Sequence, residues 1–178
     1  MEEDSNSLHE IRGRNVYCGP AAIAAVSGIT TDEAARLYRF FTFQTQTRSV
    51  GQRGTIDVLN HLGFDVEIEV PESPTSLRAF VTGQDSKQLN CLKLISVPRH
   101  FLAIHKLMIA DSENMVPVHF EKSADIEEDV DEIYWLSLAR KPKPIPTPRE
   151  LKLATERFIE PEWSSESAFE RFHKYYQF

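Results

Sequence analysis

The first regular pattern along the chain is a run of small apolar residues behind Cys18. Residues 18–28 read CGPAAIAAVSG and present no polar face. Pro20 suits the first turn of a helix, where its missing N–H is not needed, and Gly28 is a typical helix end. A helix that is apolar all round is buried on every side. The pattern therefore predicts a central buried helix whose first residue is a cysteine.

Two amphipathic helices are predicted after it. The sequence TTDE at 30–33 is a capping-box pattern, and a helical stripe of apolar residues leads from it to about Phe41. Residues 42–53 are polar and predict a loop. A further helix is expected to begin at 54–55, with the threonine as its cap, and to end at Gly63.

The next part of the chain shows the two-residue period of strands. Residues 64–70 alternate strictly between apolar and polar side chains, which indicates a half-buried strand. Ser73 and Pro74 are expected to open a short helix. Short apolar runs between turn residues then predict strands at roughly 91–97, 100–105, 107–110, 115–120 and 132–138. Helices followed by a mostly antiparallel sheet define an α+β fold class.

Two segments of biased composition flank the last predicted strand. The stretch 121–132 is rich in Asp and Glu and predicts a solvated loop, with a docking surface as the alternative. Residues 141–148 read KPKPIPTP, and this spacing of proline predicts a semi-rigid polyproline II linker. Helices are expected beyond it at 149–159 and 165–176. The second one is aromatic and is expected to pack on its own domain, with a partner-binding surface as the alternative. The expected organisation is a flexible N-terminus at 1–12, a main domain at 13–140, the linker at 141–148 and a helical extension at 149–178.

Composition excludes several classes of protein. The 178 residues are 41% hydrophobic and 26% charged, which is typical of one globular domain and not of a wholly disordered chain. No apolar run approaches the ~20 residues of a membrane span, and the polar, acidic start predicts no signal peptide. Two cysteines do not form a disulfide framework, so a reducing cytoplasm is expected. The net charge of −7 argues against non-specific nucleic-acid binding. CxxC and HExxH spacings do not occur, so neither a metal nor an organic cofactor is expected.

Cys18 is the residue most suited to chemistry. A helix N-terminus carries about half a positive charge, which stabilises a thiolate. The polar loop at 13–17 suits a segment that reaches the surface, and Gly19 lets other backbone approach the sulfur. The alternative is a buried structural cysteine, which the Cys-Gly-Pro sequence at a helix start makes less favourable. Cys91, by contrast, lies in a predicted strand and is expected to be a core residue. A nucleophilic thiolate also needs an oriented base.

His100 is the best candidate for that base. It lies where a Pro-Arg turn precedes an apolar strand, so its imidazole is expected at the strand's edge. If 100–105 and 107–110 form a hairpin, Asp111 ends the second strand beside the start of the first. The two side chains are then neighbours, as a base and its orienting carboxylate must be, provided that the register does not slip. Taken alone, the aspartate reads as a turn residue, and Asn114 is the second candidate for the orienting role.

The sequence NVYCGPAA at 15–22, followed about 80 residues later by His100 and then by Asp111, resembles the papain-like cysteine peptidase superfamily. The nearest branch is the small one typified by bacteriocin-processing peptidase domains, with compact relatives among bacteriophage and bacterial effector proteins. The resemblance covers about residues 10–138. It implies a nucleophile at the start of a central helix, with the His and Asp on adjacent strands of an antiparallel sheet. It thus implies Cys18 as nucleophile, His100 as general base and Asp111 as the residue that orients it.

The chain departs from the family pattern at two positions. The family usually supplies an oxyanion-hole glutamine shortly before the cysteine, where this chain has Arg12. Asn15 is expected to donate its amide instead, together with the backbone N–H of Cys18; the alternative for Asn15 is a turn or helix-cap residue. Relatives often have glycine before the histidine, where this chain has Arg99, which narrows the cleft or recruits an acidic group of the substrate.

Three kinds of function are compatible with these residues. The leading one is a thiol hydrolase, and most of all a cysteine peptidase acting on a peptide or protein substrate. The same triad also performs deamidation and acyl transfer, because fold does not fix reaction. The third is a non-catalytic phage or effector protein on the peptidase fold, which inhibits a host factor. No membrane or specific nucleic-acid partner is expected. The expected location is the cytoplasm, that of the host if the chain is phage-encoded.

Overall fold

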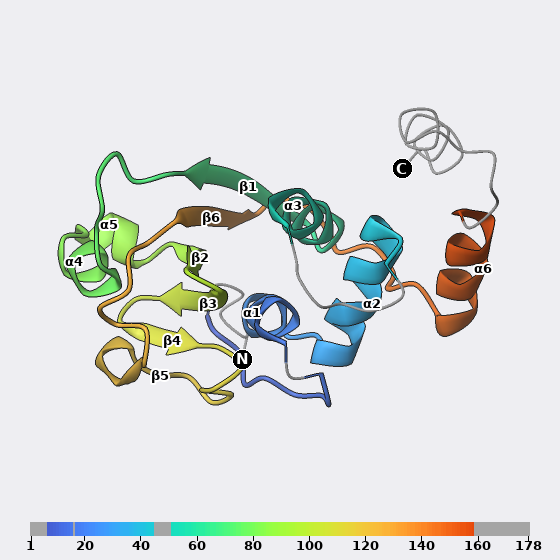
Figure 1. The fold of residues 1–178 in the computed structure, drawn as a ribbon, viewed down its shortest axis with the longest axis horizontal. Helices are drawn as coiled ribbons and strands as arrows, with labels where there is room; N and C mark the ends of the chain where they lie inside the picture. The colour runs from blue at the N-terminus through green and yellow to red at the C-terminus, as the bar shows by residue number, and fades with distance from the viewer. Residues whose placement is uncertain (1–6, 16, 45–50, 159–178) are drawn as a thin grey trace.

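The computed structural model describes residues 7–15, 17–44 and 51–158, so the helix expected at 165–176 lies outside the described residues. The centre of the fold is a six-stranded sheet in the order β1-β6-β2-β3-β4-β5 (Figure 1). The strands are β1 (Phe64–Glu69), β2 (Leu92–Val97), β3 (His100–His105), β4 (Met108–Ala110), β5 (Val118–His119) and β6 (Glu132–Leu138). Every pairing between these strands is antiparallel. The α+β class and the antiparallel sheet expected from the sequence are therefore confirmed.

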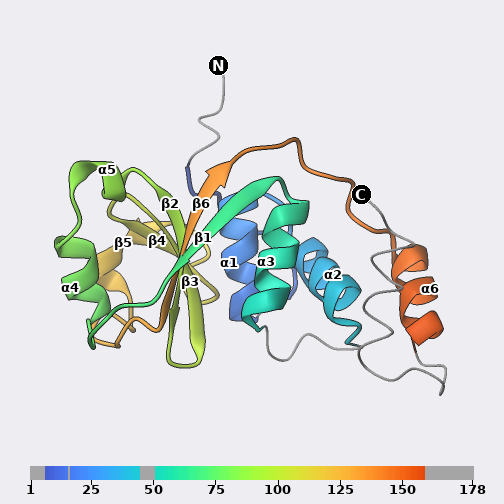
Figure 2. The ribbon, with the colours of Figure 1, turned by 90° about the horizontal axis from the view of Figure 1, so that it is seen from above.

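Helices lie on both sides of the sheet (Figure 2). On one side are α1 (Cys18–Ser27), α2 (Thr31–Thr42) and α3 (Gln52–His61). On the other are α4 (Leu77–Thr82), α5 (Ser86–Leu89) and the short 3-10 helix η1 (Phe120–Lys122). α6 (Pro148–Phe158) lies beyond α2, at the edge of the molecule. Within the described ranges no helix has the length and apolarity needed to cross a bilayer.

α1 is the buried helix that the sequence predicts. Every residue from Gly19 to Val26 is buried, and α1 lies between the sheet and α2 (Figure 2). The helix ends where Gly28 takes a left-handed conformation (φ 73°) and donates its N–H to the Ala24 carbonyl at 2.9 Å. Only glycine adopts this conformation without strain. Cys18 is thereby placed at the start of the most enclosed helix described.

The segment that leads to Cys18 is anchored to the rest of the fold. Ile11 is 3% exposed and donates its N–H to the Met115 carbonyl at 2.8 Å. The Thr31 N–H donates to the Arg12 carbonyl at 2.7 Å. Residues 11 and 12, which the sequence analysis assigns to a flexible N-terminus, are therefore fixed in place. Their bonds hold the loop that precedes Cys18.

The two helices that follow α1 begin with different devices. α2 has the predicted capping box, in which the Thr30 hydroxyl accepts the Glu33 N–H and the Glu33 carboxylate accepts the Thr30 N–H. α3 begins at Gln52, earlier than predicted, and the expected loop is shorter. The reason is that Thr55 is not a cap: its buried hydroxyl lies 3.2 Å from the Tyr38 hydroxyl, inside the helical layer.

The connection between β1 and β2 also differs from the prediction. α4 begins at Leu77 because the hydroxyl of Ser76, and not that of Ser73, accepts the N–H of Ala79 in the first helical turn. α5 is not anticipated by the sequence pattern. Cys91 follows α5, is only half-buried, and donates its thiol to the Lys87 carbonyl at 3.4 Å. The expectation that Cys91 is a core residue is wrong, because β2 begins one residue later.

Apolar side chains form one cluster on each face of the sheet, and alternating residues of β2 divide between them. Lys93 is the exception within this strand. Its side chain is fully buried, and its Nζ donates to Gln84 Oε1 at 3.1 Å and lies 5.2 Å from the centre of the Trp135 ring. Burial lowers the pKa of Lys93 to about 8.

The proline-rich segment 141–148 is held against α3. The Lys143 N–H donates to the His61 carbonyl at 3.0 Å, and His61 Nε2 lies 2.9 Å from another carbonyl of the segment. α6 then packs on α2 through Leu151, which is 8% exposed. The linker therefore fixes where α6 begins.

Candidate active site

Cys18 opens α1 at an N-terminus without a side-chain cap. The preceding residue, Tyr17, is extended (ψ 141°), and its side chain makes no capping bond. The uncapped N–H groups of a first helical turn are natural partners for an anion. The backbone N–H groups of Gly19 and, from β3, of Phe101 face the sulfur and act to lower the pKa of Cys18. This surrounding favours a thiolate over a thiol.

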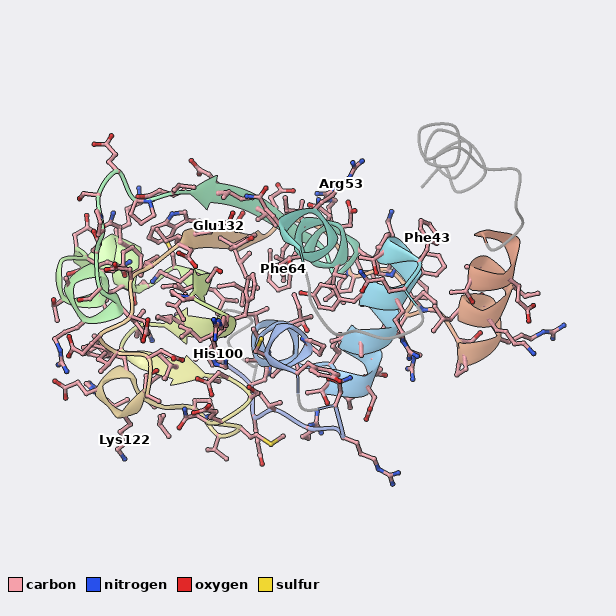
Figure 3. All side chains as sticks on the ribbon, viewed as in Figure 1. Phe43, Arg53, Phe64, His100, Lys122 and Glu132 are labelled. Carbon is pink, nitrogen blue, oxygen red and sulfur yellow. The ribbon has the colours of Figure 1, made fainter. Side chains whose placement is uncertain are left out.

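His100 is the first residue of β3 and follows a two-residue turn. Val97 pairs with His100 across the hairpin, and the turn residue Arg99 has φ 67°. Because His100 stands at the beginning of its strand, its side chain lies at the end of the sheet beside α1 (Figure 3). The side chain is 14% exposed, so the imidazole is largely withdrawn from water.

Asp111 follows β4 and shares a face of the sheet with His100. The β3–β4 register pairs Ala103 with Ala110, so its continuation by one residue sets Asp111 opposite Leu102. Side chains two residues apart in a strand point to the same face, and diagonal neighbours on adjacent strands lie within reach of each other. The hairpin predicted from the sequence is therefore confirmed, with a diagonal contact between the two residues.

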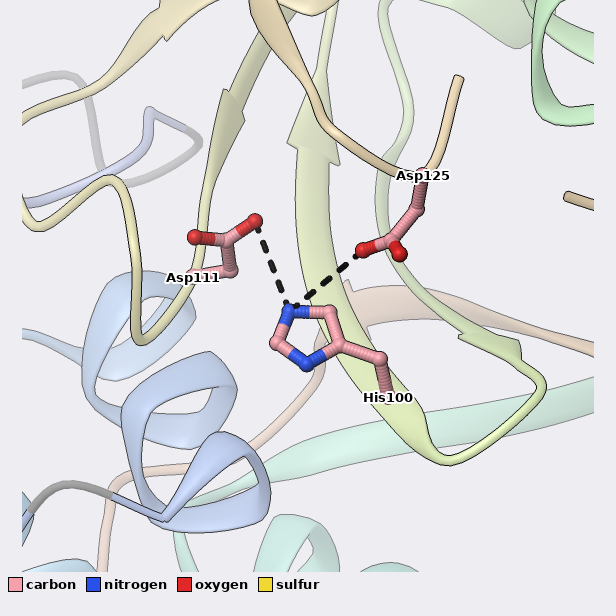
Figure 4. A group of neighbouring side chains, drawn as sticks. All are labelled: His100, Asp111 and Asp125. Atoms are coloured by element: carbon pink, nitrogen blue, oxygen red, sulfur yellow. Dashed lines mark ion pairs between the residues drawn. The ribbon is translucent and has the colours of Figure 1, made fainter. Parts of the chain in front are cut away.

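Figure 4 shows His100 between two carboxylates. Its Nε2 lies 3.5 Å from Oδ2 of Asp111 and 3.8 Å from Oδ2 of Asp125. This nitrogen is buried and makes no closer hydrogen bond within the part of the chain that the structure describes. Nδ1 points away from both carboxylates (Figure 4), and the imidazole interacts with the Cys18 thiol. The structure thus brings Cys18, His100 and Asp111 together.

Asp111 is 1% exposed and is oriented by the turn behind it. Its Oδ1 accepts the N–H groups of Glu113 at 2.8 Å and of Asn114 at 2.6 Å, and the Asn114 side-chain amide at 3.1 Å. Oδ2 remains for His100. Both interpretations of Asp111 are therefore compatible, because the turn chemistry is what holds the carboxylate. Asn114, the second candidate for the orienting role, supports Asp111 instead.

The charges of the three side chains depend on one another. Contact with Asp111 and with the thiol raises the pKa of His100 to about 10, although burial opposes the charge. Burial also opposes ionisation of Asp111, but His100 and the N–H groups of the turn outweigh it and lower the pKa of this carboxyl. Burial likewise works against the Cys18 thiolate, but His100 and two backbone N–H groups bring the pKa of Cys18 below its ordinary value. The arrangement favours a thiolate–imidazolium pair beside a carboxylate.

Asp125 is a site residue that the sequence analysis misses. It belongs to the acidic stretch 121–132, which is expected to be a solvated loop. The loop is fastened to α4, because Arg78 donates through Nε to Glu127 at 2.7 Å and through its backbone N–H to the loop at 2.9 Å. The Asp125 side chain is 25% exposed, and its attraction raises the pKa of His100 further. The acidic composition of residues 121–132 is the sequence feature that points to this loop, but composition does not indicate which carboxylate faces the site.

Asn15 lies in the loop before Cys18 with its amide oxygen already engaged. Its Oδ1 accepts the Tyr17 N–H at 3.0 Å, so Nδ2 is the end left to donate. Asn15 also lines a groove between α2 and α6 that does not include the thiol site. Arg12, at the position of the family's glutamine, is exposed and reaches the Gly28 carbonyl at 3.4 Å.

One group of side chains among the described residues has the spacing to hold a cation. His100, Asp111 and Asp125 offer ligand atoms within 4.8 Å of one another. A metal ion needs the neutral imidazole, whereas the pKa of His100 is raised to about 10. A metal ion at this group therefore has to displace the proton that the two carboxylates favour on the imidazole.

Comparison with known proteins does not identify a family for this chain. No protein-family model matches the chain, and a search of curated proteins found no match. The chemistry must therefore be argued from the geometry of the site.

Proposed function

We propose that this protein is a thiol hydrolase of the papain-like kind, and specifically a cysteine peptidase. The observation that carries the proposal is the position of His100, whose Nε2 faces the buried Asp111 carboxylate while the imidazole interacts with the Cys18 thiol. Nucleophile, base and orienting group in this order are the parts of an acyl-transfer site. The sequence resemblance of residues 10–138 to the papain-like superfamily supports the same proposal.

The first half of the reaction uses the thiolate–imidazolium pair. The Cys18 sulfur attacks the carbonyl carbon of a peptide bond, and a C–S bond forms. His100 then gives its proton to the leaving amine as the C–N bond breaks, which leaves a thioester on Cys18. Asp111 stays ionised throughout and keeps the imidazole in the orientation that this transfer needs.

The second half restores the enzyme. The neutral His100 takes a proton from water as its oxygen attacks the thioester, the C–S bond breaks, and a carboxylic acid and the Cys18 thiolate are released. The oxyanion formed in each half needs donors. We assign to it the backbone N–H of Cys18 and Nδ2 of Asn15, whose side chain has to turn from the groove that it lines toward the thiol.

The first test is the alkylation rate of Cys18 by iodoacetamide as a function of pH. A Cys91→Ser background leaves Cys18 as the reacting thiol. The ordinary pKa of a cysteine thiol is about 8.5, and alkylation of Cys18 is expected to remain fast well below that pH. In His100→Ala the rate at pH 6 should fall at least tenfold, because the cation that stabilises the thiolate is gone. Intact-mass spectrometry measures both rates.

A midpoint near the ordinary value, unchanged by His100→Ala, would contradict the proposal. A shifted midpoint leads to the second measurement, which is turnover of a peptide library read by mass spectrometry. Cleaved peptide bonds identify a peptidase. Release of ammonia from glutamine-bearing proteins without cleavage would identify a deamidase with the same residues.

A further inference from the structure

α2 and α6 face each other across a groove of about 680 Å³. One side of the groove is a face of α2. Asp32, Arg36 and Arg39 lie on this face because residues spaced at i, i+4 and i+7 point to the same side of a helix. The helix α6 contributes Leu151 and Lys152 from its facing side. The groove is distinct from the Cys18–His100 site, and we call it the α2–α6 groove.

The charge of the α2–α6 groove is opposite to that of the whole protein. Its charged lining residues are Asp32, Arg36, Arg39 and Lys152, so cations dominate it, while the chain carries a net charge of −7. Asp32 is already engaged, since its Oδ2 accepts the Arg14 N–H at 2.9 Å. Cations concentrated in a concave surface attract and orient an anionic ligand.

The cations of the groove are weakly neutralised by the protein. Arg36 lies 3.9 Å from Glu33, and Lys152 lies 3.6 Å from Glu156 at a site where the lysine is 75% exposed. Ion pairs of this kind contribute little energy in water. A carboxylate from a ligand can therefore compete for these side chains.

Arg36 also has a donor that the protein does not use. Its Nε is buried and has no acceptor among the described residues. Buried N–H groups are almost always hydrogen-bonded in folded proteins. A guanidinium binds a carboxylate best through two parallel N–H bonds. Because the Nε–H of Arg36 is buried, a carboxylate uses it only when the side chain turns toward the groove.

We propose that the α2–α6 groove binds an acidic segment of the polypeptide on which Cys18 acts. This inference rests on the proposed peptidase function. Tyr17, 46% exposed, lines the groove and is the residue before Cys18, so the groove extends to within one residue of the nucleophile. From Arg36 to Arg39 the helix rises about 4.5 Å, and alternate residues of an extended peptide lie about 6.6 Å apart. The difference is within the reach of two long arginine side chains, so carboxylates on alternate residues of the substrate can each meet one of them.

The test measures binding without turnover. A Cys18→Ala chain is titrated into a fluorescein-labelled ten-residue peptide with glutamate at alternate positions, and into its counterpart with glutamine at those positions. Fluorescence anisotropy reports the affinity. The glutamate peptide should bind at least tenfold more tightly. Arg36→Gln/Arg39→Gln should remove most of that difference, and Lys152→Gln should remove part of it.

The matched control is Lys87→Gln/Lys141→Gln, which removes the same charge from exposed positions outside the groove. It should change the affinity by less than twofold, and circular dichroism verifies that every variant is folded. Equal affinity for the two peptides, or an unchanged affinity in Arg36→Gln/Arg39→Gln, overturns the proposal. Displacement of the peptide by inorganic phosphate at equal concentration overturns it as well, because the groove is then a general anion site.

This result is independent of the alkylation experiment. If alkylation is fast and depends on His100 but the glutamate peptide is not preferred, the peptidase proposal is supported. The proposal that the groove binds the substrate is then wrong. Glutamate-selective binding with ordinary thiol reactivity has the opposite meaning: the groove binds an acidic peptide, but not as the substrate of Cys18.

Discussion

Nε2 of His100 lies 3.5 Å from Oδ2 of Asp111, although the two residues are not partners in the sheet. Their contact is diagonal, because the β3–β4 register continues to set Asp111 opposite Leu102. The turn behind β4 holds the other oxygen of Asp111 through two backbone N–H groups. The hairpin therefore decides the position of the carboxylate, and the turn decides its direction.

The two carboxylates around His100 should differ in effect. Asp111→Asn is expected to lower the pKa of His100 by about 1–3 pH units, as loss of a close opposite charge does. Asp125→Asn should lower it by less, because Asp125 lies 3.8 Å away and is 25% exposed. NMR titration of the His100 ring measures both values. A larger shift in Asp125→Asn would contradict the assignment of Asp111 as the orienting residue.

Asn15→Asp separates the structural role of Asn15 from a role in catalysis. The aspartate keeps an oxygen for the Tyr17 N–H but has no amide to donate to an oxyanion. Acylation of Cys18 by p-nitrophenyl acetate passes through an oxyanion and should slow by about 10²–10³. Alkylation by iodoacetamide forms no oxyanion and serves as the control. Equal slowing of both reactions would show that Asn15 acts on the thiol and not on the oxyanion.

Arg99→Gly should raise the melting temperature. Arg99 has φ 67°, a conformation that costs a side-chain-bearing residue about 1–2 kcal/mol and glycine almost nothing. Because glycine also makes the unfolded chain more flexible, the expected net gain is about 1 kcal/mol, or about 2–4 °C. Arg99→Ala is the control, since it removes the charge but keeps the strained Cβ. A gain of the same size in Arg99→Ala would assign the effect to charge.

Lys93→Met should stabilise the protein at neutral pH. The pKa of Lys93 falls to about 8 on burial, so folding at pH 7 either buries a cation or removes its proton, at about 3 kcal/mol for a pKa lowered this far. Methionine avoids this but loses the bond to Gln84, so a net gain of about 1–3 kcal/mol is expected. Urea unfolding at pH 7 measures it, with the exposed Lys87→Met as control.

The burial of Lys93 also predicts how the free energy of unfolding changes with pH. Between the folded pKa of about 8 and the ordinary value of 10.5, the unfolded chain binds more protons at Lys93 than the folded chain. The stability of the native sequence therefore rises with pH across this window, and the advantage of Lys93→Met should shrink from pH 8 to pH 10.5. A difference between the two proteins that does not change with pH would contradict burial of a titrating lysine.

Leu151→Ala should release α6 without unfolding the domain. Leu151 is 8% exposed and packs with Ala154 against Phe40 of α2. Truncation of a buried leucine costs about 2–5 kcal/mol. We expect this loss to exceed the free energy with which the small cluster holds α6 on α2. Hydrogen exchange of α6 should become at least tenfold faster while exchange in β2 stays slow. Leu153→Ala, at a position 47% exposed, is the matched control, and equal effects of the two variants would contradict the packing.

The parts of the site that are close in sequence follow from local patterns. Cys18 was expected to start a buried helix because a small, apolar run with Pro20 and Gly28 has one stable secondary structure. His100 and Asp111 were expected to meet because a tight hairpin joins their strands and strand parity determines the shared face. The helix starts at Gln52 and Leu77 were missed because Thr55 and Ser73 have the residue types of caps, but the Thr55 hydroxyl contacts Tyr38 and the cap of α4 is Ser76.

Contacts between distant segments were decided by the tertiary structure alone. Asp125 reaches His100 because Arg78 fastens the acidic loop to α4. Lys93 occupies a polar position in an apolar strand, yet it is buried because the segment that carries Gln84 covers it. The α2–α6 groove exists because the linker is held along α3 before α6 begins. Periodicity in a sequence encodes which face of an element is apolar, but it does not encode which remote segment covers that face. The helix that begins at Cys18 and the pairing of His100 with Asp111 could therefore be predicted from the chain, whereas the position of Asp125 and the groove could not.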